Sequence, residues 1–130
     1  MNLKIITQEK IVFDGEVDEI YSHGTDGEFG LLKNHIPVMI ALDIGVTKVK
    51  IGKDYQSFTT MGGILQFKDD KCIILTTLAE TGDEIDEMRA KEALERNHHK
   101  LKEAQSKIEA KRIEASIARA KARLKAKLNK

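Results

Sequence analysis

The sequence has 130 residues, enough for one domain with an appended element, and carries a formal net charge of +1. No stretch approaches the roughly 18 consecutive apolar residues that would make it a candidate membrane-spanning helix. The single cysteine, Cys72, excludes an internal disulfide framework and favours a reducing compartment. The N-terminus also lacks the long apolar core of a signal peptide, so we expect a soluble protein.

The charges are divided unevenly along the chain. Residues 1–85 carry 8 lysines and 14 acidic residues, which gives −6, and residues 86–130 carry 14 basic and 7 acidic residues, which gives +7. All nine glycines and the only proline, Pro37, lie before residue 83. We therefore divide the chain into an acidic, turn-rich body (residues 1–84) and a basic tail (residues 85–130) that contains no helix breaker.

The body has the pattern of a small β-protein. Segments rich in strand-forming residues occur at 3–5, 17–21, 46–51, 55–60 and 72–77. Turn sequences lie at Asp14-Gly15, Asp26-Gly27, Gly52–Asp54 and Lys68–Lys71. Short strands at this spacing predict an antiparallel sandwich or barrel. Met61-Gly62-Gly63 lies inside a strand pattern, which predicts a bulge or a close backbone approach.

The tail is composed mainly of strong helix formers, and Asp86 and Glu87 at its start complement a helix dipole. One continuous helix over residues 86–130 would extend roughly 68 Å at about 1.5 Å per residue. A two-helix hairpin would instead bury the apolar stripes on each other or on the body. The weakest helical stretch is Gln105–Lys107, yet no Gly or Pro enforces a turn. We interpret this ambiguity as a sign that both forms are close in free energy, as a conformational switch requires.

Three segments carry a resemblance to a known family. Residues 27–37, Gly-Glu-Phe-Gly-Leu-Leu-Lys-Asn-His-Ile-Pro, resemble its G-E-x-G-[IL]-L-P-x-H-x-P segment, with Lys33 in place of the proline. Gly62-Gly63-Ile64-Leu65 resembles its G-G-[FI]-L strand, and Ile85-Asp86-x-x-Arg89-Ala90 resembles the I/L-D-x-x-R-A motif of its ATP-binding members. Over essentially its whole length, the chain is similar to the epsilon subunit of bacterial F-type rotary ATP synthases.

This resemblance implies a fold, a place and a role. The fold would be a ten-stranded antiparallel β-sandwich over residues 1–84, followed by a two-helix antiparallel hairpin over residues 85–130. The chain would be a non-catalytic rotor subunit of the central stalk, bound peripherally at the cytoplasmic face of the cell membrane. It would contact the gamma subunit and the c-ring, with Glu28 and His35 as contact residues. The extended tail would reach the alpha and beta catalytic subunits and inhibit ATP hydrolysis, whereas bound ATP would keep the tail folded.

The resemblance also implies a set of nucleotide-binding residues: Glu80, Ile85, Asp86, Arg89, Ala90, Arg96, Arg119 and Arg123. The four arginines come from both halves of the tail, and a hairpin would bring them together. Four guanidinium groups in one space would repel each other unless an anion lay among them, and arginine forks match phosphate oxygens. No Walker-type phosphate loop is present, so we expect ATP as a regulatory ligand that is not hydrolysed and requires no metal.

Other interpretations of the tail remain open. The chain could be a purely structural stalk subunit without ATP sensing, with its arginines on a solvated helix face. The basic tail could instead bind nucleic acid, although no aromatic residue lies beyond Phe67 to stack on bases. His98 and His99 are adjacent and would point in different directions on a helix, which argues against a metal site.

Overall fold

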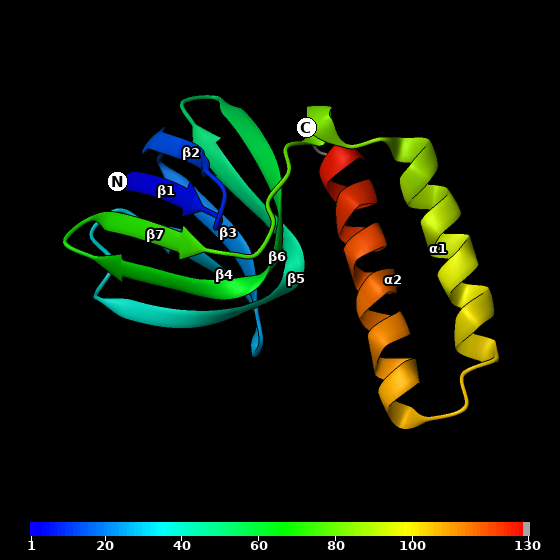
Figure 1. The fold of residues 1–130 in the computed structure, drawn as a ribbon. Helices are drawn as coiled ribbons and strands as arrows, with labels where there is room; N and C mark the ends of the chain where they lie inside the picture. The colour runs from blue at the N-terminus through cyan, green and yellow to red at the C-terminus, as the bar shows by residue number, and fades with distance from the viewer. Residues whose placement is uncertain (129–130) are drawn as a thin grey trace.

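The computed structural model describes residues 1–128, and Figure 1 shows a β body beside a pair of helices. The described strands are β1 (Asn2–Ile6), β2 (Ile11–Glu16), β3 (Glu19–Gly24), β4 (Gly27–Leu32), β5 (Val38–Ile51), β6 (Asp54–Lys68) and β7 (Lys71–Leu75). They are followed by a short 3-10 helix, η1 (Gly82–Glu84), and by α1 (Glu87–Lys102) and α2 (Lys107–Leu128). Neither of these two helices is long and apolar enough to cross a membrane.

The strands of residues 1–128 form one sheet in the order β2-β1-β7-β6-β5-β3-β4, which curves over itself into two layers (Figure 1). Six pairs of neighbouring strands make up the described sheet. The β1–β7 pair is parallel, and the other five pairs are antiparallel. The expected ten antiparallel strands are therefore wrong in number and in direction. The number is smaller because β5 and β6 are single strands of 14 and 15 residues that run through both layers. The parallel pair arises because the first and last strands of the body meet side by side.

The two long strands are interrupted at their middle. Leu42 pairs with Gly63 and Ile44 pairs with Met61, so the regular pairing is broken between them. Gly62 and Gly63 adopt φ values of 75° and 117°, a region that side chains other than glycine rarely tolerate. A Cβ atom on Gly63 would lie 1.9 Å from the carbonyl oxygen of Leu75. The close backbone approach predicted for this segment is confirmed.

The body has its own hydrophobic core. Its innermost residues have at most 1% of their surface exposed and come from six of the strands: Leu3, Ile5, Ile20, Leu31, Val49, Phe58, Leu65, Phe67, Cys72 and Ile74. Within the part of the chain that the structure describes, no residue after Ala79 belongs to this cluster. The helices therefore pack outside a core that is already closed.

Local turn signals were reliable except at one place. The turns around Asp26, Gly52–Lys53 and Asp69–Asp70 connect successive strands as predicted. Asp14 and Gly15, predicted as a turn, instead lie inside β2 and pair with Lys4 and Leu3 of β1. Pairing with a neighbouring strand has overridden the local preference there.

The tail forms the two-helix hairpin, as expected. Asp86 caps α1, because its side chain accepts a hydrogen bond from the Arg89 amide at 3.1 Å. The helical conformation is interrupted between Lys102 and Lys107, next to the stretch predicted to have the weakest helix preference. There the Ser106 hydroxyl accepts a hydrogen bond from the Glu109 amide at 3.1 Å and so caps the start of α2, while the Glu109 carboxylate accepts from the Gln105 amide at 3.3 Å.

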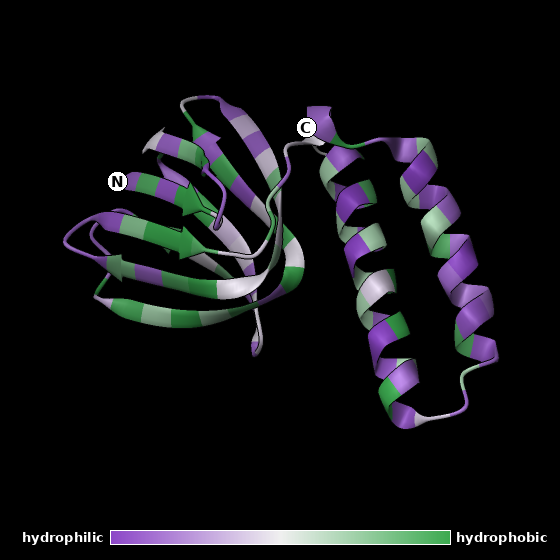
Figure 2. Ribbon diagram, viewed as in Figure 1, coloured by the Kyte–Doolittle hydropathy of each residue, from purple (hydrophilic) through white to green (hydrophobic). Residues whose placement is uncertain are grey.

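Helix α2 lies between α1 and the body and packs against β5, β6 and η1 (Figure 1). The buried residues of α2 are two isoleucines and three alanines: Ile113, Ile117, Ala120, Ala122 and Ala126. Hydrophilic residues predominate along both helices and leave only separate apolar bands (Figure 2). The helices are thus joined to the body by a thin, alanine-rich contact.

Candidate functional site

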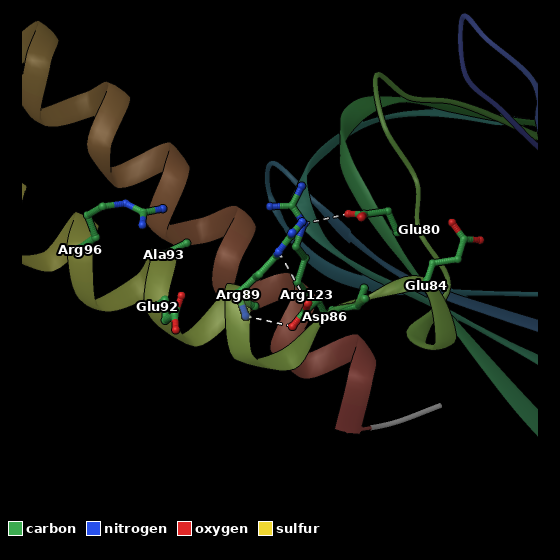
Figure 3. Close-up of a pocket in the computed structure, with 10 residues that line it drawn as sticks. Glu80, Glu84, Asp86, Arg89, Glu92, Ala93, Arg96 and Arg123 are labelled. Atoms are coloured by element: carbon green, nitrogen blue, oxygen red, sulfur yellow. Dashed lines mark hydrogen bonds and ion pairs between the residues drawn. The ribbon is translucent and has the colours of Figure 1, made fainter.

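A cavity of about 560 Å³ lies where the segment after the body, the first turns of α1 and the last turns of α2 meet (Figure 3). Its lining consists of Glu80, Glu84, Ile85, Asp86, Arg89, Ala90, Glu92, Ala93, Arg96 and Arg123. The fold has brought together residues separated by more than forty positions in the sequence. Seven of the eight residues predicted to bind a nucleotide line this cavity, and the exception is Arg119.

The start of α1 is held in place by its cap and by a buried neighbour. Ile85 is 4% exposed, and Asp86 begins the helix by binding the amide of Arg89. Ala90 is also 4% exposed and allows α1 to approach α2 closely. The Arg89 guanidinium remains largely exposed, with its Nε 3.7 Å from an Asp86 carboxylate oxygen. Arg89 is therefore positioned by the backbone but is available to a ligand.

The opposite wall is held by a partly buried ion pair. The Nε of Arg123 on α2 donates to the Glu80 carboxylate at 2.8 Å, and both side chains are less than one-third exposed. The Glu80 backbone is fixed on β6, because its amide donates to the Thr59 hydroxyl at 2.9 Å and its carbonyl accepts from the Thr59 amide at 2.8 Å. Charge-assisted bonds of this kind are stronger than neutral ones. The pair joins the last turns of α2 to the body.

The remaining two arginines differ in their placement. Arg96 lines the cavity from α1 and is exposed. Arg119 lies one turn before Arg123 on α2, is half-buried, and donates to the Ser116 hydroxyl at 2.8 Å. The structure therefore gathers three of the four predicted arginines around the cavity, and Arg119 is not among its lining residues.

The cavity also contains more negative charge than the sequence indicated. Four carboxylates line it, Glu80, Glu84, Asp86 and Glu92, against three guanidinium groups. Glu84 and Glu92 were missed by sequence reasoning. Glu92 could have been found from its spacing, since it lies three residues after Arg89 and four before Arg96 and so shares their helix face. In a lining of this kind, the guanidinium groups can donate paired hydrogen bonds to phosphate oxygens. The carboxylates can accept hydrogen bonds from hydroxyl or amino groups.

The two residues predicted to contact the c-ring lie in different surroundings. Glu28 lies inside β4 rather than in a loop, and its carboxylate is 3.8 Å from Lys125 Nζ on α2 and 4.0 Å from His23 Nδ1. His35 follows the turn after β4, where its ring meets Phe67 edge-on with centroids 6.0 Å apart. Glu28 therefore faces the hairpin, whereas His35 lies beyond the other end of β4.

Lys33, which departs from the resembled motif, is part of an ionic contact. Its Nζ is 3.3 Å from one Asp18 carboxylate oxygen, and the other oxygen accepts the Gly52 amide at 2.8 Å. The hydrogen bond from Gly52, followed by that from Lys33, lowers the pKa of Asp18 from its ordinary value. The next residue, Asn34, has a φ of 64°, and its amide donates to Asp70 at 3.2 Å. The segment leading to His35 is thus fixed on two sides.

Comparison with known proteins agrees with this arrangement of body and helices. The beta-sandwich domain described as ATP synthase, Delta/Epsilon chain, matches residues 1–82, and the long alpha-helix domain of the same description matches residues 83–127. The chain belongs to the ATP synthase delta/epsilon family. Within this family it is of the epsilon type, a non-catalytic stalk subunit and not an enzyme by itself.

The curated relatives of the chain match it over nearly their whole length. The ATP synthase epsilon chain of Desulforamulus reducens is 36% identical over 124 residues, covering 95% of this chain and 94% of the relative. That of Syntrophobacter fumaroxidans is 39% identical over 125 residues, covering 96% and 93%. The assignment to the epsilon type therefore applies to both the body and the helices.

Solved structures extend the likeness to the fold. A chain in the Euglena gracilis mitochondrial ATP synthase, in a structure of its OSCP, F1 and c-ring, has a TM-score of 0.84 at 24% identity. The match covers 97% of this chain and 79% of that one. A chain in the central stalk and c-ring structure of the Tetrahymena thermophila enzyme has a TM-score of 0.64 at 13% identity, covering 97% and 95%.

Proposed function

We propose that this chain is the central-stalk rotor subunit that holds the gamma subunit on the c-ring, peripherally at the cytoplasmic face of the cell membrane. Two findings support this placement. The curated relatives are epsilon chains, and the solved chains of the same fold come from assemblies described as F1 with c-ring and as central stalk with c-ring. In this role the body transmits rotation mechanically, and His35 and Glu28 are candidate contact residues.

We propose further that the hairpin is a sensor for ATP. The observation that carries this proposal is the cavity between the helices, which takes Arg89 and Arg96 from α1 and Arg123 from α2. A polyphosphate bound by both helices stabilises the hairpin only, because an extended helix separates Arg89 from Arg123. A ligand with this difference in affinity shifts the population toward the hairpin.

The arrangement of charges indicates how ATP would lie. The phosphates accept hydrogen bonds from the guanidinium groups, and Glu80 and Asp86 are left for the ribose hydroxyls, the adenine amine or the orientation of arginine. ATP is a regulatory ligand here, since the cavity offers no nucleophile paired with a base. Magnesium is not required by this arrangement.

When ATP is scarce, the tail extends toward the alpha and beta subunits and inhibits ATP hydrolysis. The thin contact of α2 with the body supports this step, since the core cluster lies entirely within residues 1–79 and stays closed when the hairpin leaves. The alternative is a structural stalk subunit with a permanently folded tail, and it differs by showing no nucleotide binding.

Calorimetric titration of the isolated chain with ATP tests the sensor. We expect saturable one-to-one binding, stronger for ATP than for ADP, and a loss of about 10- to 100-fold in Arg123→Ala because a bond to a charged group is removed. Arg89→Ala, which leaves the Glu80–Arg123 pair intact, should show a similar loss.

Arg112→Ala is the matched control, since Arg112 is an exposed arginine on α2 that does not line the cavity. Its affinity for ATP should equal that of the wild-type chain. Unchanged affinity in both Arg123→Ala and Arg89→Ala would refute the site, and absence of binding at millimolar ATP would leave only the structural role.

A further inference from the structure

Glu92 is one of the residues of α1 that line the cavity. It lies on α1 between Arg89 and Arg96, three residues from the first and four from the second (Figure 3). Residues at these spacings are neighbours on one helix face. A phosphate chain held by both arginines would therefore lie in the same cavity as the Glu92 carboxylate, within the range over which like charges repel.

The other three carboxylates of the cavity have partners. Glu80 accepts from Arg123, and Asp86 accepts from the Arg89 amide. Glu84 accepts from the Thr81 hydroxyl at 3.2 Å. Glu92 has no hydrogen bond or ion pair within residues 1–128, and its side chain is exposed. Its negative charge is the least compensated in the lining.

A carboxylate without a positively charged partner repels a polyphosphate electrostatically but does not repel an uncharged ligand. Two like charges about 4 Å apart in water repel each other enough to change an equilibrium constant by about fivefold, and the effect increases with the number of phosphate charges. It weakens with salt, because the Debye length falls from about 30 Å at 0.01 M to about 3 Å at 1 M. These dependences separate repulsion from a contact to the base or sugar.

We propose that Glu92 sets the ATP affinity of this site, by holding it below the value that the three arginines alone would give. The proposal rests on the proposed nucleotide site and adds a residue that opposes binding. Such a residue lets ATP leave the hairpin as its concentration falls, which a sensor of a changing ATP level requires.

The test is titration of Glu92→Gln with ATP, ADP and AMP at low salt. Glutamine keeps the size and the helix propensity of glutamate and removes only the charge. We expect ATP to bind about fivefold more tightly than to the wild-type chain, with a smaller gain for ADP and the smallest for AMP. The gain should shrink in high salt. Glu95→Gln is the matched control, because Glu95 is exposed on the same helix and does not line the cavity.

Three results would overturn the proposal while the wild-type chain still binds ATP. They are an unchanged affinity in Glu92→Gln, a weaker affinity that would make Glu92 a contact for ribose or adenine, and an equal gain in Glu95→Gln that would reflect net charge. If neither the wild-type chain nor either variant binds ATP, the proposed nucleotide site itself fails and this inference fails with it. Thermal unfolding of each variant verifies that the hairpin remains folded.

Discussion

At the scale of single residues, Asp18 joins three separate turns. It lies between β2 and β3 and binds Lys33 in the turn after β4 and the Gly52 amide in the turn after β5. In the resembled motif the place of Lys33 belongs to proline, which restricts the backbone directly. Here Lys33 makes an ionic contact with Asp18 instead, close to the turn that leads to His35.

Replacing Asp18 by Asn should change the way in which the stability of the folded chain depends on pH. The folded-state pKa of Asp18 is lowered from 3.8, so its stabilisation is present above that value and is lost as pH falls through the lower folded pKa. The wild-type chain should therefore exceed Asp18→Asn in stability at neutral pH, and the difference should disappear in strong acid. Urea unfolding at a series of pH values measures it, together with hydrogen exchange of the Gly52 amide. Asp14→Asn serves as an exposed control, and a difference that persists unchanged in acid would contradict the ionic contact.

At the scale of elements, the body and the hairpin are held together differently. The strands share one closed core, while α2 contacts the body largely through alanines and a few larger residues. The Glu80–Arg123 and Glu28–Lys125 pairs add polar contacts at the edges of this interface. The apolar part of this interface is therefore made mainly of small side chains, which bury less apolar surface per residue than large ones.

The thiol of Cys72 can report whether the body depends on the hairpin. Cys72 is 0% exposed in β7, and burial raises its pKa to about 12, so the folded chain should resist alkylating reagents even at about pH 9. Deleting residues 86–130 should change the labelling rate by less than about tenfold, because labelling requires opening of the body core. Labelling in denaturant provides the reference rate. Rapid labelling of the truncated chain would mean that the helices complete the core.

At the scale of the whole molecule, the cavity is formed jointly by the body and the hairpin. Its walls come from the end of the body, from α1 and from α2, so it exists only while the hairpin is folded. A ligand of this cavity stabilises the folded hairpin by RT ln(1 + [L]/Kd), which is about 2.7 kcal/mol at a ligand concentration one hundred times Kd. That amount is enough to shift a nearly balanced equilibrium between hairpin and extended helix.

Deleting residues from 86 onward in the assembled synthase tests this regulation. If the tail inhibits ATP hydrolysis as proposed, we expect hydrolysis to increase on its removal, while ATP synthesis remains coupled through the intact body. Hydrolysis rates and proton pumping by reconstituted complexes measure both effects. Arg123→Ala in the full chain should show stronger inhibition at a given ATP level, since the hairpin is then less favoured. Loss of coupling on truncation would instead make the tail a structural part of the stalk.

The division into an acidic body and a basic tail and the helical nature of the tail could be predicted from the residues alone, because they depend on composition and on local helix preference. The residues of the candidate site came from the resemblance of short motifs to a known family. The stretch near Gln105 was predicted to have the weakest helix preference, and the Ser106–Glu109 cap explains why a new helix begins there.

Other features were fixed only by contacts in the folded molecule. The parallel pairing of β1 with β7, the place of Asp14-Gly15 inside β2 and the single long β5 and β6 depend on contacts between residues far apart in sequence. The choice of hairpin over extended helix, and the entry of Glu92 and Glu84 into the cavity, were fixed only when α2 packed between α1 and the body. Such contacts gain their free energy from burial and pairing across the fold, which no local stretch of sequence contains.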